Sequence, residues 1–356
     1  MKKRKTRKAK AGTLLFTRFF LSLPLILSTA ACSAAQTSGS LATATPLVPV
    51  PASSPASGSA SQLPTEEVKL SAPATRAEAE EKLKNLVKSF EFSFKDSVQQ
   101  NLSSGAQSYS YALYDVRHDA CVSCANARRC RAASSIKPLI MARIFQRVEA
   151  GELYLDQEYL VDEAEVVGGA GSIITSSQRL FSLQRLLELM MHESDNSASN
   201  ALVRLSGGLP ALNHLAQALG LKNTHMGRLF MYPGDGEEIE NWTSAEDLAL
   251  LVARMHQGRL ISPEADRAMV EIMSGDIAEE PFAERLGSEV LSSYAKGGLL
   301  AGSRSCVNVL DTRLGLLVMV GMEDGIAAEE DALEDMRAIG KSVYRAYSSL
   351  LRTVSS

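Results

Sequence analysis

The sequence predicts a mixed α/β (α+β) fold, in which a five-stranded antiparallel sheet is flanked by N- and C-terminal helices. A mostly helical lobe is inserted between strands 2 and 3. Three observations support this prediction. Strand-like alternation occupies residues 108–125 and returns in segments between 292 and 322. Residues 134–273 between them have almost wholly helical apolar spacing. Helical spacing also precedes the first strand and follows the last one.

The first elements are a helix and a hairpin. Thr75-x-x-Glu78 has the form of a capping box, and apolar residues then recur at helical spacing as far as Phe94. The next segment, 108–125, alternates like a strand, turns at 115–119 and continues as a second strand.

The apolar spacing over residues 134–273 predicts several helices, and strand signals follow them. One amphipathic helix covers Leu183 to Met191, another runs from Pro210 to Gly220, and a third begins with the capping box Thr243-x-x-Glu246 and ends at Gly258. Strand signals follow at 292–298, 305–311 and 315–322, the last two joined by a turn at 312–314. A closing helix has its apolar face between residues 333 and 350. We expect the functional site in the cleft between sheet and lobe.

The N-terminal segments predict export. Residues 1–35 hold a basic start, a short apolar run and a lipobox-like stretch ending at Cys32, which we expect to be lipidated. Plain secretion and an uncleaved anchor are the alternatives. Residues 36–74 are rich in Ser, Ala, Thr and Pro, as in a disordered linker, and we expect residues 75–356 to form the folded domain. We therefore expect a protein at the extracytoplasmic face of a bacterial membrane, or secreted.

Charge and cysteine content narrow the classes of partner. Residues 1–35 carry eight of the 37 Lys and Arg residues and no acid, so without them the formal charge changes from −4 to −12. Such an acidic chain lacks the basic face that nucleic acid requires. We expect a monomer without metal or organic cofactor. Cys121-x-x-Cys124, Cys130 and Cys306 have no second CxxC or paired histidines, which favours a structural disulfide or free thiols over zinc.

The strongest candidate for catalysis is Ser134-x-x-Lys137 at the start of a helix. Residues three apart share a helix face, so Lys137 faces Ser134 rather than Ser135. The free N–H groups of a helix N-terminus favour a developing oxyanion there. A lysine held against a serine hydroxyl can accept its proton if its surroundings lower the lysine pKa. Taken alone, the same spacing also describes a simple helix cap.

Two further motifs follow in order. Ser194-Asp195-Asn196 lies between two helical segments, and Lys296-Gly297-Gly298 lies on a late strand. The succession of Ser-x-x-Lys, Ser-Asp-Asn and Lys-x-Gly resembles the penicillin-recognising serine enzymes, and within them the class A β-lactamase branch. The resemblance covers residues 77–352. It implies an enzyme that acts on a β-lactam or a D-Ala-containing cell-wall peptide.

The resemblance implies four catalytic residues. Ser134 is the acylated nucleophile, and Lys137 is its activating base. Ser194 relays a proton towards the leaving nitrogen, and Lys296 supplies positive potential towards Ser194 and a substrate carboxylate.

It also implies the residues that bind the substrate. Asn196 holds the substrate amide, and the N–H groups of Ser134 and Leu299 form the oxyanion hole. Gly297 and Gly298 let the substrate backbone lie alongside the strand, and Arg304 is a second partner for a carboxylate. The glycine-rich segment 167–173 has no P-loop lysine after it, and we interpret it as a flexible wall of the cleft.

Two departures from the family pattern affect the expected chemistry. Gly297 replaces the hydroxyl residue of the Lys-Thr-Gly or Lys-Ser-Gly motif. In the Arg-x-Glu-x-x-Leu-Asn loop, Arg228 fits the arginine, but Phe230 stands where the deacylating glutamate belongs. Glu237 and Asn241 are spaced like the Glu and Asn of this motif, yet they lie too close to the next helix to align well with it.

The sequence leaves four hypotheses for function. The first is a β-lactamase-type hydrolase that forms an acyl-enzyme and is slow in deacylation. The alternatives are a penicillin-binding, D-Ala peptidase-like enzyme, a non-catalytic cell-wall-binding module of the same fold, and a promiscuous esterase with the same nucleophile.

Overall fold

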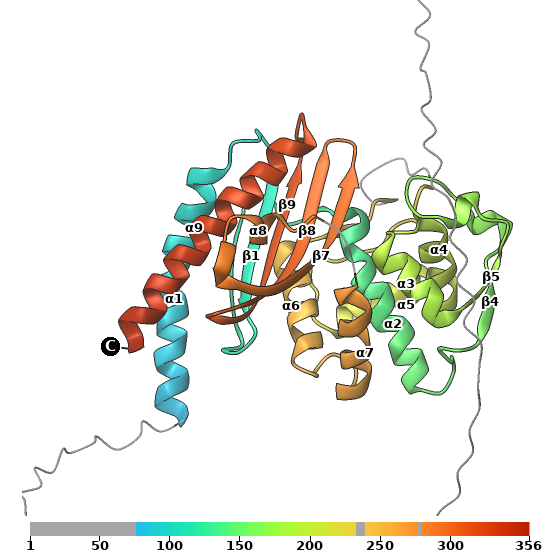
Figure 1. The fold of residues 1–356 in the computed structure, drawn as a ribbon, viewed down its shortest axis with the longest axis horizontal. Helices are drawn as coiled ribbons and strands as arrows, with labels where there is room; N and C mark the ends of the chain where they lie inside the picture. The colour runs from blue at the N-terminus through green and yellow to red at the C-terminus, as the bar shows by residue number, and fades with distance from the viewer. Residues whose placement is uncertain (1–75, 233–238, 276–278, 356) are drawn as a thin grey trace, which may run out of the picture. The chain divides into compact units, whose positions relative to one another are not determined.

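The computed structural model describes residues 76–232, 239–275 and 279–355 (Figure 1). The expected export signal with Cys32, the linker and the capping box at Thr75 lie outside the described residues. One sheet has the strand order β2-β1-β9-β8-β7, and every neighbouring pair is antiparallel. This confirms the predicted fold class. The strands are β1 (Ser108–Asp115), β2 (Ala120–Ala125), β7 (Val290–Leu300), β8 (Ser303–Thr312) and β9 (Gly315–Asp324).

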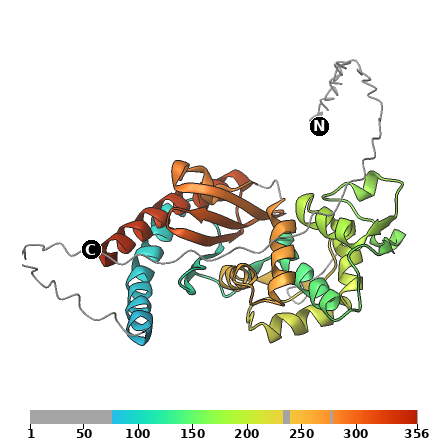
Figure 2. The ribbon, with the colours of Figure 1, turned by 60° about the horizontal axis from the view of Figure 1, so that its bottom comes forward.

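The terminal helices cover one face of this sheet (Figure 2). Helix α1 (Arg76–Asn101) packs against α9 (Glu329–Ser355), and the short helix α8 (Pro281–Glu284) packs against α9 and β8. A buried apolar cluster fills the space between these helices and the sheet, with Phe90, Phe94, Met336 and Tyr347 among its members. The helical spacing of these residues in the sequence thus results from burial of one face of each helix.

The helical lobe covers the other face and extends beyond the edge strand β7. Its helices are α2 (Lys137–Glu149), α3 (Leu183–His192), α4 (Asn196–Leu205), α5 (Gly208–Ala218), α6 (Ala245–His256) and α7 (Pro263–Ser274). There are also two small two-stranded sheets outside the central one. β3 (Cys130–Arg131) pairs with β6 (Trp242–Thr243), and β4 (Glu158–Leu160) pairs with β5 (Leu180–Ser182). Strands of two or three residues are too short for the alternation that would have predicted them. In the described part of the chain, no helix is long and apolar enough to cross a membrane.

The cap of α6 differs from the prediction by one residue. Thr243 belongs to β6, and Ser244 is the N-cap, where its Oγ accepts a hydrogen bond from the N–H of Asp247 at 3.2 Å. The predicted box at Thr243 and Glu246 is therefore wrong. A cap at Thr243 and a cap at Ser244 both satisfy the capping pattern. Thr243 pairs with Cys130 in the small sheet, so Ser244 is the residue that caps the helix.

The described cysteines are free thiols in two separate cores. Cys121 packs against the lobe core and Cys124 lies in the core beneath the terminal helices, because residues three apart on β2 face opposite sides. A disulfide between these two residues is incompatible with that strand. Burial raises the pKa of the Cys121 and Cys130 thiols to about 12, so both stay protonated at neutral pH. Within the described residues no cluster of His, Cys, Asp and Glu could hold a metal ion.

A buried carboxyl group in β9 makes the stability of the fold dependent on pH. The Glu323 side chain is fully buried, and it accepts hydrogen bonds from the hydroxyls of Ser104, at 2.6 Å, and Tyr111. Burial raises the Glu323 pKa from 4.5 to about 7, and the nearby charge of Asp335 adds to this increase. The folded state therefore binds the proton more tightly than the unfolded state does.

Because the folded pKa lies above the unfolded one, this contribution to stability is complete below about pH 4.5 and is lost as pH rises through about 7. We expect the wild type to lose about 1–3 kcal/mol of unfolding free energy relative to Glu323→Gln when the pH is raised from 5 to 8. Urea unfolding at both pH values measures it. An unchanged difference would contradict this assignment.

Candidate functional site

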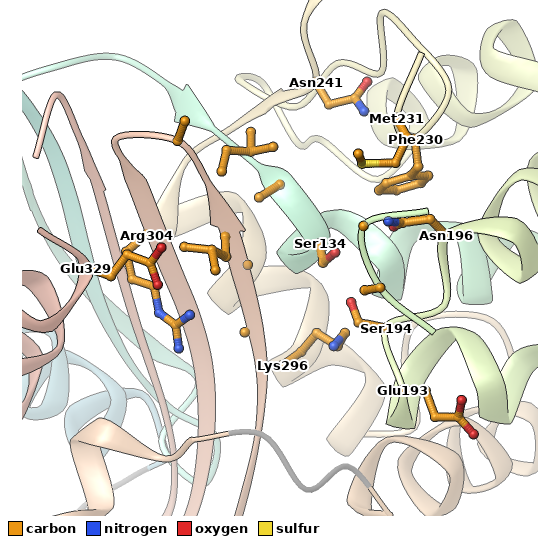
Figure 3. A pocket seen from close by; sticks show the side chains of 18 of the residues that line it. Ser134, Glu193, Ser194, Asn196, Phe230, Met231, Asn241, Lys296, Arg304 and Glu329 are labelled. Atoms are coloured by element: carbon orange, nitrogen blue, oxygen red, sulfur yellow. The ribbon is translucent and has the colours of Figure 1, made fainter. Parts of the chain in front are cut away.

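A cavity of about 980 Å³ opens where the edge strand β7 meets the helical lobe (Figure 3). Ser134 lies at its centre, between Lys296 on the sheet side and Ser194 and Asn196 on the lobe side. Residues of all three motifs therefore line one cavity, although Ser134 and Lys296 are 162 positions apart in the sequence. Gly297, Gly298, Leu299 and Arg304 line it as well.

Strained backbone surrounds this cavity. Four described residues other than glycine have a positive φ, and three of them line the cavity: Ala133 (49°), Ser194 (53°) and Met231 (61°). Residues with a Cβ rarely adopt this conformation, and such strain persists where the surrounding structure enforces it. Sequence patterns do not reveal these angles.

The backbone at Ala133 starts a 3₁₀ turn, Ala133–Ile136, that leads directly into α2. Ser134 faces the cavity from this turn, whereas Ser135 is fully buried and donates its hydroxyl to the carbonyl of Ala132 at 2.6 Å. Ser135 is thus occupied by a local hydrogen bond. Of the two adjacent serines, Ser134 is the one that lines the cavity.

Lys137 connects the first two motifs. Its side chain is fully buried, and its Nζ donates to the carbonyl of Ser194 at 2.6 Å, to Ser194 Oγ at 3.0 Å and to Asn196 Oδ1 at 3.2 Å. Nζ also lies 4.7 Å from the centre of the Phe230 ring. A buried amine is therefore held beside Ser194 by hydrogen bonds and covered by an aromatic face.

Asp195, the middle residue of the second motif, has a structural role. It is the N-cap of α4, and its carboxylate accepts from the N–H of Ala198 and of Ile173, both at 2.9 Å. A Cβ at Gly171 would lie 2.1 Å from Asp195 Oδ2, so only glycine fits at this close approach. The segment 167–173 is thereby fixed against α4, so the expected flexible wall is wrong as to flexibility, although Gly169 does line the cavity.

Phe230 is fixed beside Lys137 by a residue that the sequence analysis missed. The N–H of Phe230 donates to Asn200 Oδ1 at 2.9 Å, and Asn200 Nδ2 donates to the Phe230 carbonyl at 3.1 Å. Asn200 lies one turn after Asn196 on α4, a helical spacing that is visible in the sequence. This pair of bonds sets the Phe230 backbone so that its ring faces the Lys137 amine.

An ion pair closes the loop that carries Phe230. Arg228 contacts Glu240 through two bonds, from Nε to Oε1 at 2.9 Å and from Nη2 to Oε2 at 3.0 Å, and each side chain is 17% exposed. Asn241 Oδ1 accepts from the N–H groups of Gly227 and Arg228 and thus supports the same loop. Glu237, the suggested substitute for the missing glutamate, lies outside the described residues.

The third motif forms the wall opposite α4. Lys296 is almost fully buried and lines the cavity from β7. A Cβ at Gly298 would lie 2.4 Å from Ser305 Oγ and 3.0 Å from both the Ala132 carbonyl and the Ala133 Cβ. The strand thereby approaches the Ser134 turn more closely than any side chain permits. At Gly297 the nearest atom would be 3.9 Å away.

The two glycines therefore differ in the space that they leave for a side chain. We expect Gly298→Ala to lower the unfolding free energy by about 1–3 kcal/mol, because the new methyl group must displace backbone. Gly297→Ala, the matched control, has room for its methyl group and should change stability by less than about 0.5 kcal/mol. Urea unfolding of both variants is the measurement. Equal losses would show that the approach of β7 to the turn is not tight.

The remaining predicted residues lie at the far end of β7. Leu299 lines the cavity and pairs with Arg304 in the β7–β8 register. The Arg304 side chain is 11% exposed, and its Nη2 donates to the carboxylate of Glu279. Sequence reasoning missed Glu279, which carries no motif. It also missed other residues of the cavity lining, including His192, Met231, Tyr232 and Glu329.

The sequence and the fold of this chain are similar to those of known proteins. A family model described as the beta-lactamase enzyme family matches residues 93–347. Over 234 residues the chain is 27% identical to the extended-spectrum beta-lactamase PER-1 of Pseudomonas aeruginosa, covering 60% of this chain and 73% of that protein.

Among solved structures, a beta-lactamase from Sphaerobacter thermophilus is similar with a TM-score of 0.66 and 24% identity, covering 72% of this chain and 97% of that one. PBP-A is similar with a TM-score of 0.62 and 22% identity, covering 75% and 97%. A variant of PBP-A has been solved as an acyl-enzyme complex with penicillin G. At these identities, the structural similarity shows a shared fold.

Proposed function

Since this chain belongs to the beta-lactamase enzyme family and is a class A β-lactamase-like serine hydrolase that acts on β-lactams, we propose that it does so through an acyl-enzyme on Ser134. The observation that carries the proposal is the buried Lys137 amine, hydrogen-bonded to Ser194 and Asn196 in the cavity that Ser134 lines. Ser134 and Ser194 line one cavity, and the Lys137 amine contacts Ser194, which supports the roles of nucleophile, relay and base in this proposal.

In the proposed acylation, Ser134 Oγ attacks the β-lactam carbonyl carbon while its proton passes to the Lys137 amine. The N–H groups of Ser134 and Leu299 hold the oxyanion. The C–N bond of the ring then breaks, and the nitrogen receives a proton through Ser194 Oγ, which lies 3.0 Å from Lys137 Nζ. Asn196 binds the amide of the acyl group, and Lys296 attracts the substrate carboxylate.

Deacylation is the slow step in this proposal. Hydrolysis of the ester on Ser134 requires a water molecule and a base that removes its proton. The Phe230 ring lies 4.7 Å from the Lys137 amine, where the family pattern has a glutamate, and an aromatic ring accepts no proton. The acyl group should therefore remain on Ser134 long after the ring has opened.

Phe230 also favours a second candidate function. A long-lived acyl-enzyme suits a penicillin-binding, D-Ala peptidase-like enzyme whose natural acyl donor is a cell-wall peptide. A non-catalytic binding module would not need the Lys137 network. The basic and apolar N-terminal segment supports placing this activity outside the cytoplasm, with Cys32 as the site of a lipid anchor.

Intact-protein mass spectrometry with benzylpenicillin tests the proposal. We expect the purified protein to gain the mass of one penicillin, and Ser134→Ala to gain none. Ser135→Ala, which changes the adjacent hydroxyl, should acquire the adduct as the wild type does. An adduct on Ser134→Ala, or none on the wild type, would contradict the proposed nucleophile.

A further inference from the structure

Arg304 is already paired with a carboxylate inside the cavity. Its side chain is largely buried at 11% exposure, and Nη2 donates to Glu279, whose side chain is 56% exposed. Both residues line the cavity. Arg304 Nε is buried without a hydrogen-bond partner among the described residues, so Glu279 provides the main polar contact of this guanidinium.

The position of Glu279 is set by its backbone. Its carbonyl accepts the Cys306 thiol at 3.8 Å, and Cys306 pairs with Gly297 in the β7–β8 register. The next residue, Glu280, accepts the hydroxyl of Ser293 on β7. Glu279 therefore enters the cavity from a segment attached to β7 and β8.

Gly297 leaves the guanidinium accessible beside the strand. A Cβ at this position would meet Arg304 Nη2 at 3.9 Å as its nearest neighbour. A ligand group in that space would reach the same nitrogen atom that Glu279 holds. Glu279 and such a ligand group therefore compete for one donor.

The charges around Arg304 are unfavourable to a second anion. Glu329, the first residue of α9, also lines the cavity and lies with Arg304 on the sheet side, opposite Asn196 (Figure 3). Glu279 and Glu329 thus both line the cavity together with this one guanidinium. Arg228 and Glu240, which also line it, are paired one to one.

We propose that Glu279 is a specificity-determining residue, which occupies Arg304 and so selects against acyl donors that carry a free carboxylate at this end of the cavity. A carboxylate must displace Glu279 before it binds Arg304, whereas an ester or amide at the same position need not. The site thus favours acyl donors whose carboxylate contacts Lys296 alone, or that carry no charge beside Arg304. This inference rests on the proposed acylation of Ser134.

The test compares benzylpenicillin, which has the free carboxylate, with its methyl ester, which lacks it. The second-order rate constant of acylation is measured by mass spectrometry for wild type and Glu279→Gln. We expect Glu279→Gln to increase the rate with benzylpenicillin about three- to tenfold relative to the rate with the ester. In Arg304→Ala, the additional Glu279→Gln change should have no such effect.

Glu193→Gln is the matched control, since Glu193 also lines the cavity but pairs with Arg185. It removes one negative charge without touching Arg304, and the ratio of the two rates should stay within about twofold of the wild type. If wild type and Glu279→Gln have the same ratio of the benzylpenicillin rate to the ester rate, or if Glu193→Gln raises this ratio as much as Glu279→Gln does, the role of Glu279 is overturned. The proposed acylation of Ser134 would not be affected by that result. Absence of a Ser134 adduct with both compounds would overturn the proposed function and this inference with it.

Discussion

Phe230→Glu is expected to shorten the lifetime of the acyl-enzyme by about a hundredfold or more, the usual contribution of a positioned general base. The backbone of residue 230 is held by two hydrogen bonds to Asn200, which do not depend on the side chain. A carboxylate at this position would lie beside the Lys137 amine, so its charge would be compensated. It would also face the cavity that holds the ester.

The measurement is the loss of the penicillin adduct with time after free benzylpenicillin is removed. Phe230→Gln is the control, because it matches glutamate in size and polarity but has no basic carboxylate. The adduct on this variant should persist as on the wild type. If both variants release the acyl group equally fast, access of water rather than a base limits deacylation, and our account of Phe230 is wrong.

Lys137→Met is expected to reduce the rate of acylation by about a thousandfold or more, within the range of a lost general base. Methionine keeps the length and apolar stem of the side chain but removes the amine. The three hydrogen bonds to Ser194 and Asn196 disappear with it. Ser134 would then lack the proton acceptor that the proposal assigns to it, and the relay through Ser194 would lose its donor.

Acylation is measured with benzylpenicillin over a wide range of concentrations, and thermal unfolding checks that the variant is folded. The conservative control is Lys137→Arg, which keeps the positive charge but stays protonated at neutral pH. If the amine acts as a base, the arginine variant should be as slow as the methionine variant. Rapid acylation of the arginine variant would mean that Lys137 provides only charge.

Much of the fold could be predicted from local patterns. The alternation over 108–125 and the three late segments correspond to the strands of the central sheet, and the apolar spacing marked α3, α5 and α9. These patterns result from burial of one face, which depends on local periodicity. The lobe sheets and the cap of α6 depend instead on partners far apart in the chain, such as Cys130 and Thr243.

Contacts between residues far apart in the chain also limited the prediction of the site. Spacing on a helix predicted that Ser134, and not Ser135, belongs with Lys137, and the structure places only Ser134 in the cavity lining. The family pattern predicted that Phe230 replaces the deacylating glutamate, and the structure adds that its ring lies beside Lys137. Its fixation by Asn200 and the pairing of Glu279 with Arg304 required the folded chain, because neither contact joins residues of one motif.

The central claim is that Ser134 is acylated quickly and released slowly. The most direct test mixes the protein with an excess of a chromogenic cephalosporin and follows ring opening from the first second. We predict a rapid phase of about one ring opened per protein molecule, followed by a much slower steady phase. Steady turnover from the start without such a burst, or no ring opening at all, would contradict the claim.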